Sequence, residues 1–126
     1  MKRILVVDDN ILMRKLIINL FHKEAIAFDE ACDGLDGLEK LSVNSYDLII
    51  TDIVMPKMEG IELIMEVKRR YPFMKIIAIS GGEPLYLYMA KKLGIRDVFT
   101  KPLNQQGFSA AVLHALQCPG EILIPG

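Results

Sequence analysis

The chain has 126 residues, which is enough for one domain of ordinary size and too few for a second sizeable one. With 15 basic and 16 acidic side chains, its net charge of −1 argues against a broad electrostatic grip on nucleic acid or on an anionic membrane. An apolar fraction of 52% and a charged fraction of 25% are ordinary for a globular protein and argue against intrinsic disorder.

The first part of the chain alternates short apolar runs with stretches of helical period. Residues 4–7 predict a buried strand, because they are apolar, mostly β-branched and followed by acids. A helix is expected after Asn10, its predicted N-cap, where apolar residues recur to form a core stripe of Met13, Leu16, Ile17, Leu20 and Phe21. Residues 26–31 predict a weaker strand, and a turn at Asp33–Gly34 leads to a short helix carrying Leu35, Leu38 and Leu41.

The same alternation continues through the second half of the chain. Residues 47–52, 75–80 and 96–100 predict three further strands. A loop with Pro56 and Gly60 follows the first of them, and a turn at Gly81–Gly82 follows the second. The helices between and after these strands carry apolar residues at helical spacing: Ile61, Leu63, Ile64, Met65 and Val67, then Tyr86, Met89, Ala90 and Leu93, and finally Phe108, Val112 and Leu116. Gly94 is placed to end the second of these three helices.

Five strand–helix repeats predict an α/β protein with a parallel sheet, right-handed crossovers and helices on both faces. In such sheets the functional residues gather beyond the carboxyl ends of the strands. The residues at those ends lie far apart in the chain and are chemically active types: Asp8, Asp9, Asp52, Ser80 and Lys101. A parallel sheet would bring them to one edge, and we therefore take them as the predicted site.

Three carboxylates at one edge repel one another. A hard divalent cation such as Mg²⁺ would relieve that repulsion, because it prefers oxygen ligands, whereas the single ammonium of Lys101 compensates only in part. A cation, an ammonium and a hydroxyl are the groups that stabilise a transferring phosphoryl group, and a carboxylate can itself accept one. Asp52 is the expected acceptor, because its strand should lie in the middle of the sheet.

These residues resemble the signature of a response-regulator receiver domain of two-component signalling, in its stand-alone form. The resemblance covers about residues 2–117 and rests on VVDDN at 6–10, DIVMPKMEG at 52–60, ISG at 79–81, Ala90 with Gly94, and TKP at 100–102. It implies a three-layer α/β/α sandwich of the flavodoxin-like, doubly wound type with strand order 2-1-3-4-5. It also implies a cis bond between Lys101 and Pro102. We expect the receiver domain to occupy 1–118, followed by an irregular tail over 119–126, which contains two prolines and two glycines.

The resemblance implies a role for each residue of the site. Asp52 is the phosphoacceptor, and the Mg²⁺ ligands are Asp8, Asp9, Asp52 and the backbone carbonyl of Val54. Lys101 pairs with the carboxylate before phosphorylation and with the phosphoryl group after it, while the Ser80 hydroxyl and the Gly81 N–H donate to that group. The domain would catalyse only its own phosphorylation and dephosphorylation, so it is expected to be a switch and not an enzyme acting on other substrates.

Ser80 and Phe99 form the switch that the resemblance implies. Ser80 moves toward the phosphoryl group, Phe99 turns inward, and the face made by the fourth helix, fifth strand and fifth helix changes. Phe99 has a second interpretation as a static core aromatic. Leu85, Leu87 and Tyr88 cannot all face the core, and we expect one or two of them to contact a partner.

The implied function is a phosphorelay switch. It takes phosphate from a histidine kinase or phosphotransfer protein and signals to a protein partner, or to an output domain outside this chain, without direct contact with nucleic acid or a membrane. No apolar run is long enough for a signal peptide or a membrane helix, so a cytoplasmic location is expected. Cys32 and Cys118 lack the number and spacing of a disulfide scaffold or metal site, and we interpret them as buried or half-buried thiols.

Two other classes of function fit parts of the pattern. A receiver-like module that binds partners without phosphorylation would lack Mg²⁺ binding, and the complete set of site residues argues against it. A Mg²⁺-dependent phosphatase with an aspartyl nucleophile commonly has a second acid two residues further on, where this chain has Val54. The chain is either a natural single-domain protein or the receiver part of a longer one.

Overall fold

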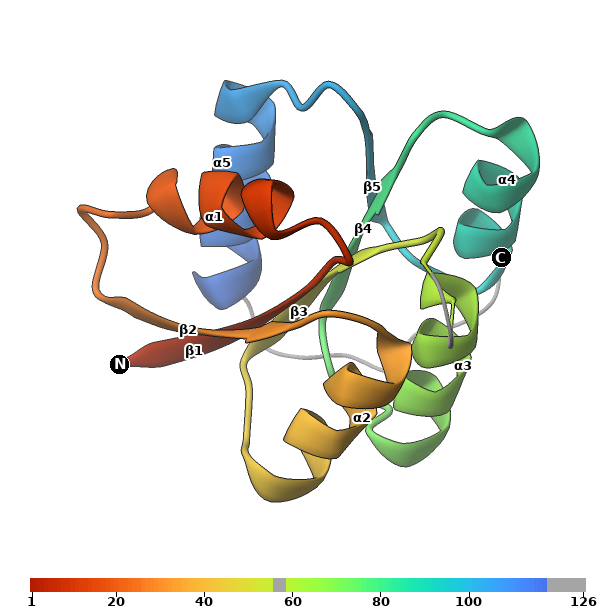
Figure 1. Ribbon diagram of the computed structural model, residues 1–126, viewed down its shortest axis with the longest axis horizontal. Coiled ribbons are helices and arrows are strands. Elements are labelled where there is room, and N and C mark those ends of the chain that lie inside the picture. The colour runs from red at the N-terminus through yellow and green to blue at the C-terminus, as the bar shows by residue number, and fades with distance from the viewer. Residues whose placement is uncertain (56–58, 118–126) are drawn as a thin grey trace.

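The computed structural model describes residues 1–55 and 59–117, which form a five-stranded parallel sheet with helices on both faces (Figure 1). The strands are β1 (Lys2–Val7), β2 (Ile26–Ala31), β3 (Leu48–Asp52), β4 (Ile76–Ser80) and β5 (Asp97–Thr100). The helices are α1 (Ile11–Asn19), α2 (Gly34–Val43), α3 (Gly60–Arg70), α4 (Pro84–Lys92) and α5 (Gln105–Gln117). The strand order β2-β1-β3-β4-β5 confirms the predicted fold class and places β3 in the middle of the sheet.

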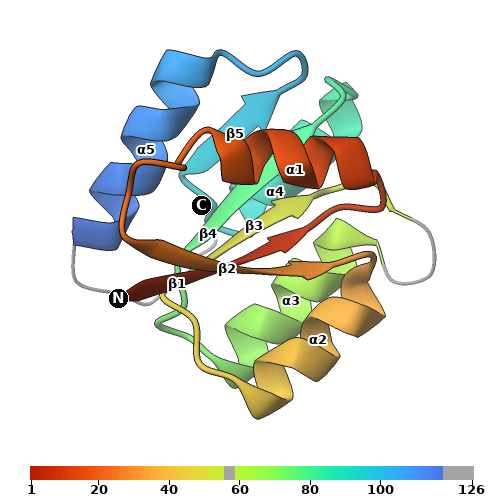
Figure 2. The same ribbon diagram turned by 60° about the vertical axis from the view of Figure 1, so that its left-hand side comes forward.

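Two apolar clusters fill the space between the sheet and its helices. α1 and α5 cover one face of the sheet (Figure 2). On that face Ile17 and Phe108 pack against strand residues such as Ile4. α2, α3 and α4 cover the opposite face, where Leu63 and Ala90 belong to the second cluster. Because both faces are covered, every residue of β3 and β4 is buried, and these strands are almost continuously apolar.

Local signals set the ends of three helices. Asn10 is the N-cap of α1, as predicted: its Oδ1 accepts hydrogen bonds from the N–H groups of Leu12 (2.9 Å) and Met13 (3.3 Å). Asp33 caps α2 in the same way, so the predicted turn at Asp33–Gly34 is the start of that helix. Gly94 follows α4 with a φ of 89°, the left-handed conformation in which glycine commonly ends a helix.

Two sequence interpretations are wrong. Leu16 does not belong to a core stripe, because it is 42% exposed; α1 contacts the sheet through Met13 and Ile17, and Leu16 lies about 100° around the helix from Ile17. Cys32 is exposed, because it follows the edge strand β2 where the chain turns into α2. Cys118, Pro56 and the predicted tail over 119–126 lie outside the described residues. None of the described helices is long and apolar enough to span a membrane.

Candidate functional site

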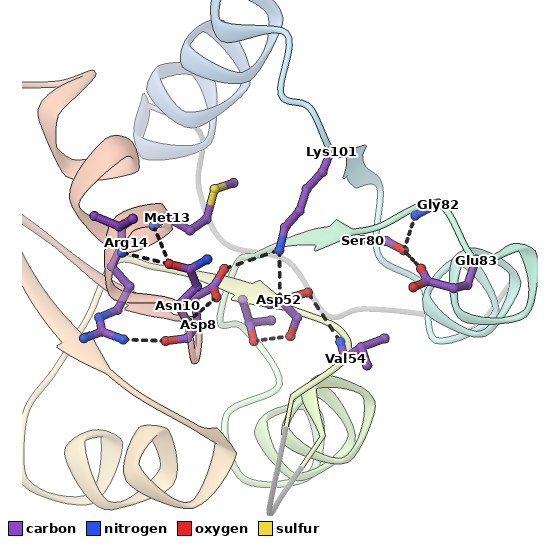
Figure 3. A network of polar contacts seen from close by, with 12 residues as sticks. Asp8, Asn10, Met13, Arg14, Asp52, Val54, Ser80, Gly82, Glu83 and Lys101 are labelled. Carbon is purple, nitrogen blue, oxygen red and sulfur yellow. Dashed lines mark hydrogen bonds and ion pairs between the residues drawn. The ribbon is translucent and has the colours of Figure 1, made fainter.

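The predicted site residues meet at the carboxyl edge of the sheet (Figure 3). Asp52 and Ser80 are the last residues of β3 and β4, Asp8 follows β1, and Lys101 follows β5. The strand register brings these ends level, since Val7 pairs with Thr51, Asp52 with Ile79, and Ser80 with Thr100. Positions up to 93 residues apart in the sequence are therefore neighbours in the fold, as the parallel sheet predicts.

Three carboxylates form an acidic cluster, which we define as Asp8, Asp9 and Asp52. One carboxylate oxygen from each lies within 4.8 Å of the others. Asp8 and Asp52 are buried, at 1% and 5% exposed, whereas Asp9 is exposed. Oδ2 of Asp8 is fully buried and has no hydrogen-bond partner among the described residues, which is costly for a carboxylate oxygen. The cluster thus presents oxygen atoms that a cation can satisfy.

Asp8 is held in place by the start of α1. Its Oδ1 accepts a hydrogen bond from the Asn10 N–H at 2.9 Å, and the Arg14 guanidinium donates to its backbone carbonyl at 2.6 Å. Burial raises the pKa of Asp8 from 3.8 to about 6, and the neighbouring charges of Asp52 and Asp9 add to the rise. The Asn10 N–H and the Lys101 ammonium oppose it. The ionised form of Asp8 is therefore energetically disfavoured in the absence of a bound cation.

Lys101, which follows β5, contacts two members of the acidic cluster. Its Nζ lies 3.1 Å from Oδ2 of Asp52 and 3.9 Å from Oδ2 of Asp8. Burial alone would lower the pKa of Lys101, but the hydrogen bond to Asp52 and the three carboxylate charges raise it above its ordinary value, so the ammonium is charged. The backbone N–H of Lys101 donates to the Ser80 carbonyl at 2.8 Å, and the Lys101–Pro102 bond is cis, as the resemblance implies.

Ser80 reaches the edge of the sheet, but its hydroxyl faces away from the acidic cluster. Its Oγ donates to Oε2 of Glu83 at 3.2 Å and accepts from the Gly82 N–H at 3.1 Å. Figure 3 shows this side chain directed toward the start of α4, while Asp52 points toward Lys101. Gly81 lies between Ser80 and Glu83 and is exposed. The structure therefore brings Ser80 near the site without joining it to Asp52 in the part of the chain described.

The remaining predicted residues have simpler surroundings. The Val54 N–H donates to Oδ1 of Asp52 at 3.4 Å, and the Val54 side chain is 38% exposed beside the acidic cluster. Phe99 is half-buried on β5, and its ring meets the edge of the Phe108 ring at a centroid distance of 5.4 Å and an interplanar angle of 84°. Such packing is compatible with both interpretations of Phe99.

Sequence reasoning missed two residues that shape this edge. Arg14 holds the backbone after β1, and it is itself paired with Glu30 at 2.9 Å. Glu83 accepts a hydrogen bond from the Ser80 hydroxyl. The spacing of Ser80 and Glu83 matches that of a capping box, but Glu83 is itself the N-cap of α4 and makes no capping hydrogen bond, so that pattern did not signal the contact.

The buried charge of Asp8 predicts an unusual pH dependence. Because its folded pKa lies above its unfolded value, the folded state binds the proton more tightly, and stability falls as pH rises from about 4 to about 6. Asp8→Asn removes this cost, so in a metal chelator we expect the variant to be more stable at pH 7.5 by on the order of 2 kcal/mol. Urea unfolding of both proteins at several pH values measures the difference.

The difference between the two proteins should shrink toward zero as the pH falls below about 3, because Asp8 is protonated in both states only below its ordinary pKa of 3.8. Asp47→Asn is the matched control, because Asp47 is exposed at the other end of β3 and accepts a hydrogen bond from the Arg3 N–H. It should change stability little at any pH. If the difference in the free energy of unfolding between Asp8→Asn and the unchanged protein did not vary with pH, the conclusion that burial disfavours the charge of Asp8 would be wrong.

Comparison with known proteins agrees with this geometry. The family model described as "Response regulator receiver domain" matches residues 4–113. The chain is 35% identical over 105 residues to the chemotaxis protein CheY of Thermotoga maritima, covering 82% of this chain and 88% of that protein. It is 31% identical over 117 residues to the transcriptional regulatory protein CpxR homolog of Haemophilus influenzae, covering 93% of this chain. It is also 35% identical over 104 residues to the Regulator of RpoS of Escherichia coli, covering 82% of this chain.

The match to the last two relatives is partial on their side, because the chain spans 51% of the CpxR homolog and 31% of the Regulator of RpoS. Among solved structures, a CheY-like receiver domain protein from Methanospirillum hungatei superposes with a TM-score of 0.85 at 26% identity, covering 92% of this chain and 94% of that one. The response regulator TrrA of Thermotoga maritima, solved in complex with Mg²⁺ and BeF, gives 0.78 at 29% identity, covering 91% and 99%.

These matches confirm the resemblance and the fold that it implied. The family model alone extends over most of the chain and includes the whole edge where the acidic cluster, Ser80 and Lys101 meet. The chain therefore belongs to the response regulator receiver domain family of two-component signalling.

Proposed function

We propose that this chain is a phosphorylation switch in which Asp52 accepts a phosphoryl group from a histidine kinase or phosphotransfer protein. The observation that carries the proposal is the placement of Asp52: a buried carboxylate with two other carboxylates within 4.8 Å and the Lys101 ammonium at 3.1 Å. An acceptor for a phosphoryl group needs a nucleophilic oxygen beside positive charge, and this edge supplies both.

The same edge fits Mg²⁺. Three carboxylate oxygens gather there, and the buried Oδ2 of Asp8 has no hydrogen-bond partner among the described residues. We assign the metal to Asp8, Asp9, Asp52 and the backbone carbonyl of Val54. A bound Mg²⁺ would neutralise the repelling carboxylates and the charge of the transferring phosphoryl group.

In the proposed reaction an oxygen of Asp52 attacks the phosphorus of a phosphohistidine. The new O–P bond forms as the N–P bond breaks, and the bonding electron pair remains on the imidazole, which leaves neutral because its other nitrogen carries a proton. Lys101 holds the carboxylate before transfer and pairs with a phosphoryl oxygen afterwards. The Ser80 hydroxyl and the Gly81 N–H are the proposed donors to the remaining oxygens. Later attack by water on phosphorus returns the free carboxylate, so the domain resets itself.

The proposed output face comprises α4, β5 and α5. Phosphorylation replaces one carboxylate charge with a group of about −1.5 to −2 that carries three strong acceptors, and it would draw Ser80 toward Asp52. Phe99, which is half-buried and rests on Phe108, would then turn inward. Leu85 and Tyr88 support the use of this face by a partner, because they are 64% and 60% exposed, more than large apolar side chains usually are.

The partners follow from this assignment. A histidine kinase or phosphotransfer protein would supply the phosphate in the cytoplasm, and a downstream protein, or an output domain outside this chain, would read the changed face. We propose no direct contact with nucleic acid, in keeping with the net charge of −1.

The proposal is tested by incubating the protein with acetyl phosphate and Mg²⁺ and measuring its intact mass. We expect transfer of one phosphoryl group to the protein, with acetate as the leaving group of that step. Mild hydrolysis should then remove the added group as inorganic phosphate. The phosphate should be absent when a chelator removes Mg²⁺, because the repulsion within the acidic cluster then opposes an incoming anion. Equal labelling with and without the metal, or no labelling under any donor, would overturn the proposed function.

A further inference from the structure

Glu83 accepts the only proton that the Ser80 hydroxyl can donate. Ser80 is fully buried, and its Oγ lies 3.2 Å from Oε2 of Glu83. Oγ of Ser80 also accepts a hydrogen bond from the Gly82 N–H at 3.1 Å. A serine hydroxyl has a single donor, so it cannot give a hydrogen bond to a phosphoryl group on Asp52 while it gives one to Glu83. The two acceptors therefore compete for one proton.

The backbone around Gly81 permits this contact. A Cβ atom on Gly81 would stand 3.1 and 3.2 Å from the two carboxylate oxygens of Glu83, so the glycine leaves the space that the carboxylate occupies. Glu83 is the N-cap residue of α4, yet its side chain makes no capping hydrogen bond to that helix. The carboxylate is directed back across Gly81 to Ser80, as Figure 3 shows.

From this geometry we infer that Glu83 is a positioning residue that holds Ser80 in the unphosphorylated orientation and must release it when Asp52 is phosphorylated. The inference rests on the proposed function. A hydrogen bond to a carboxylate is about twice as strong as one to a neutral acceptor. Glu83 thus favours the resting state, and replacing its charge with the amide of glutamine weakens that preference while keeping the size of the side chain.

Beryllofluoride with Mg²⁺ serves as the probe, because it binds carboxylates as a stable mimic of a phosphoryl group. In calorimetric titrations we expect Glu83→Gln to bind it about fivefold more tightly than the unchanged protein. Glu62→Gln is the matched control, since Glu62 is exposed in the first turn of α3, and it should leave the affinity unchanged. Equal gains in both variants would mean a general effect of charge and would overturn the inference.

A double-mutant cycle tests whether Glu83 acts through Ser80. Ser80→Ala should weaken binding, and adding Glu83→Gln to it should have no further effect, because no hydroxyl remains to be held. A gain of the same size in the Ser80→Ala background would show direct repulsion between Glu83 and the anion. That result would refute the positioning role.

A second measurement needs no phosphoryl mimic. Three-bond NMR couplings report the rotamer of Ser80, which should be single in the unchanged protein and averaged in Glu83→Ala. An averaged rotamer in the unchanged protein would overturn the inference. Failure of the unchanged protein to bind beryllofluoride would refute the proposed function, and the couplings would still decide whether Glu83 holds Ser80.

Discussion

Asp52→Ala is expected to abolish phosphate incorporation from acetyl phosphate and from a cognate kinase. Asp52 is the last residue of the central strand, and its Oδ2 faces the Lys101 ammonium at 3.1 Å. Alanine removes the attacking oxygen, and the proposed chemistry has no other nucleophile. Intact mass spectrometry after equal incubation of both proteins measures the loss, which should be complete within the detection limit.

Asp47→Ala is the control for this experiment. Asp47 immediately precedes β3, at the opposite end from Asp52, and is exposed. It should be labelled like the unchanged protein. Persistent labelling of Asp52→Ala at another acid, such as Asp9, would show that the acidic cluster has no single acceptor and would remove the basis of the proposed mechanism.

Gly60→Ala is expected to destabilise the fold by more than about 3 kcal/mol. A Cβ atom on Gly60 would lie 1.9 Å from the Asp52 carbonyl oxygen and 2.6 Å from the Ile53 Cα. Both neighbours are backbone atoms, so no side-chain rotation relieves the overlap. The Gly60 N–H also donates to the Ile53 carbonyl at 2.8 Å, which ties the start of α3 to the chain just after Asp52.

Urea unfolding measures the loss of stability in Gly60→Ala. Gly107→Ala is the matched control, for which we expect a gain of stability. Gly107 lies in α5, where a Cβ atom would come no closer than 3.6 Å to a neighbour, the Asn104 side chain. Alanine there should stabilise the protein by about 0.5–1 kcal/mol, since glycine is a poor helix former. A Gly60→Ala protein as stable as the unchanged one would contradict the close approach of α3 to β3.

The sequence was sufficient to predict the layers of this fold, because short apolar runs mark its strands and apolar residues at helical spacing mark its helices. Strand order was available only through resemblance, since periodicity carries no information on which strands are neighbours. Leu16 was misassigned because a helical stripe gives the direction of the core only to within about one residue. Cys32 was misassigned because its exposure depends on β2 lying at the edge of the sheet.

Some features of the candidate site were also predictable from the sequence, and others were not. Asp8, Asp9, Asp52 and Lys101 were predictable because a parallel sheet must bring its strand ends together. The structure places one carboxylate oxygen of each acid within 4.8 Å of the others, and it places the Lys101 ammonium within ion-pairing distance of Asp8 and Asp52. The direction of the Ser80 hydroxyl was not predictable. It depends on a rotamer and on the neighbouring Glu83 carboxylate, and neither leaves a mark in the pattern of apolar residues.

The pairing of Lys101 with Asp52 spans 49 positions of the chain and has a consequence during synthesis. A nascent polypeptide that has left the ribosome only as far as α4 already carries every acid of the cluster but lacks the amine. Under the proposed function, such a fragment would lack the ammonium that pairs with the transferred phosphoryl group. The proposed switch would therefore become competent to accept a phosphoryl group only after synthesis has passed Lys101.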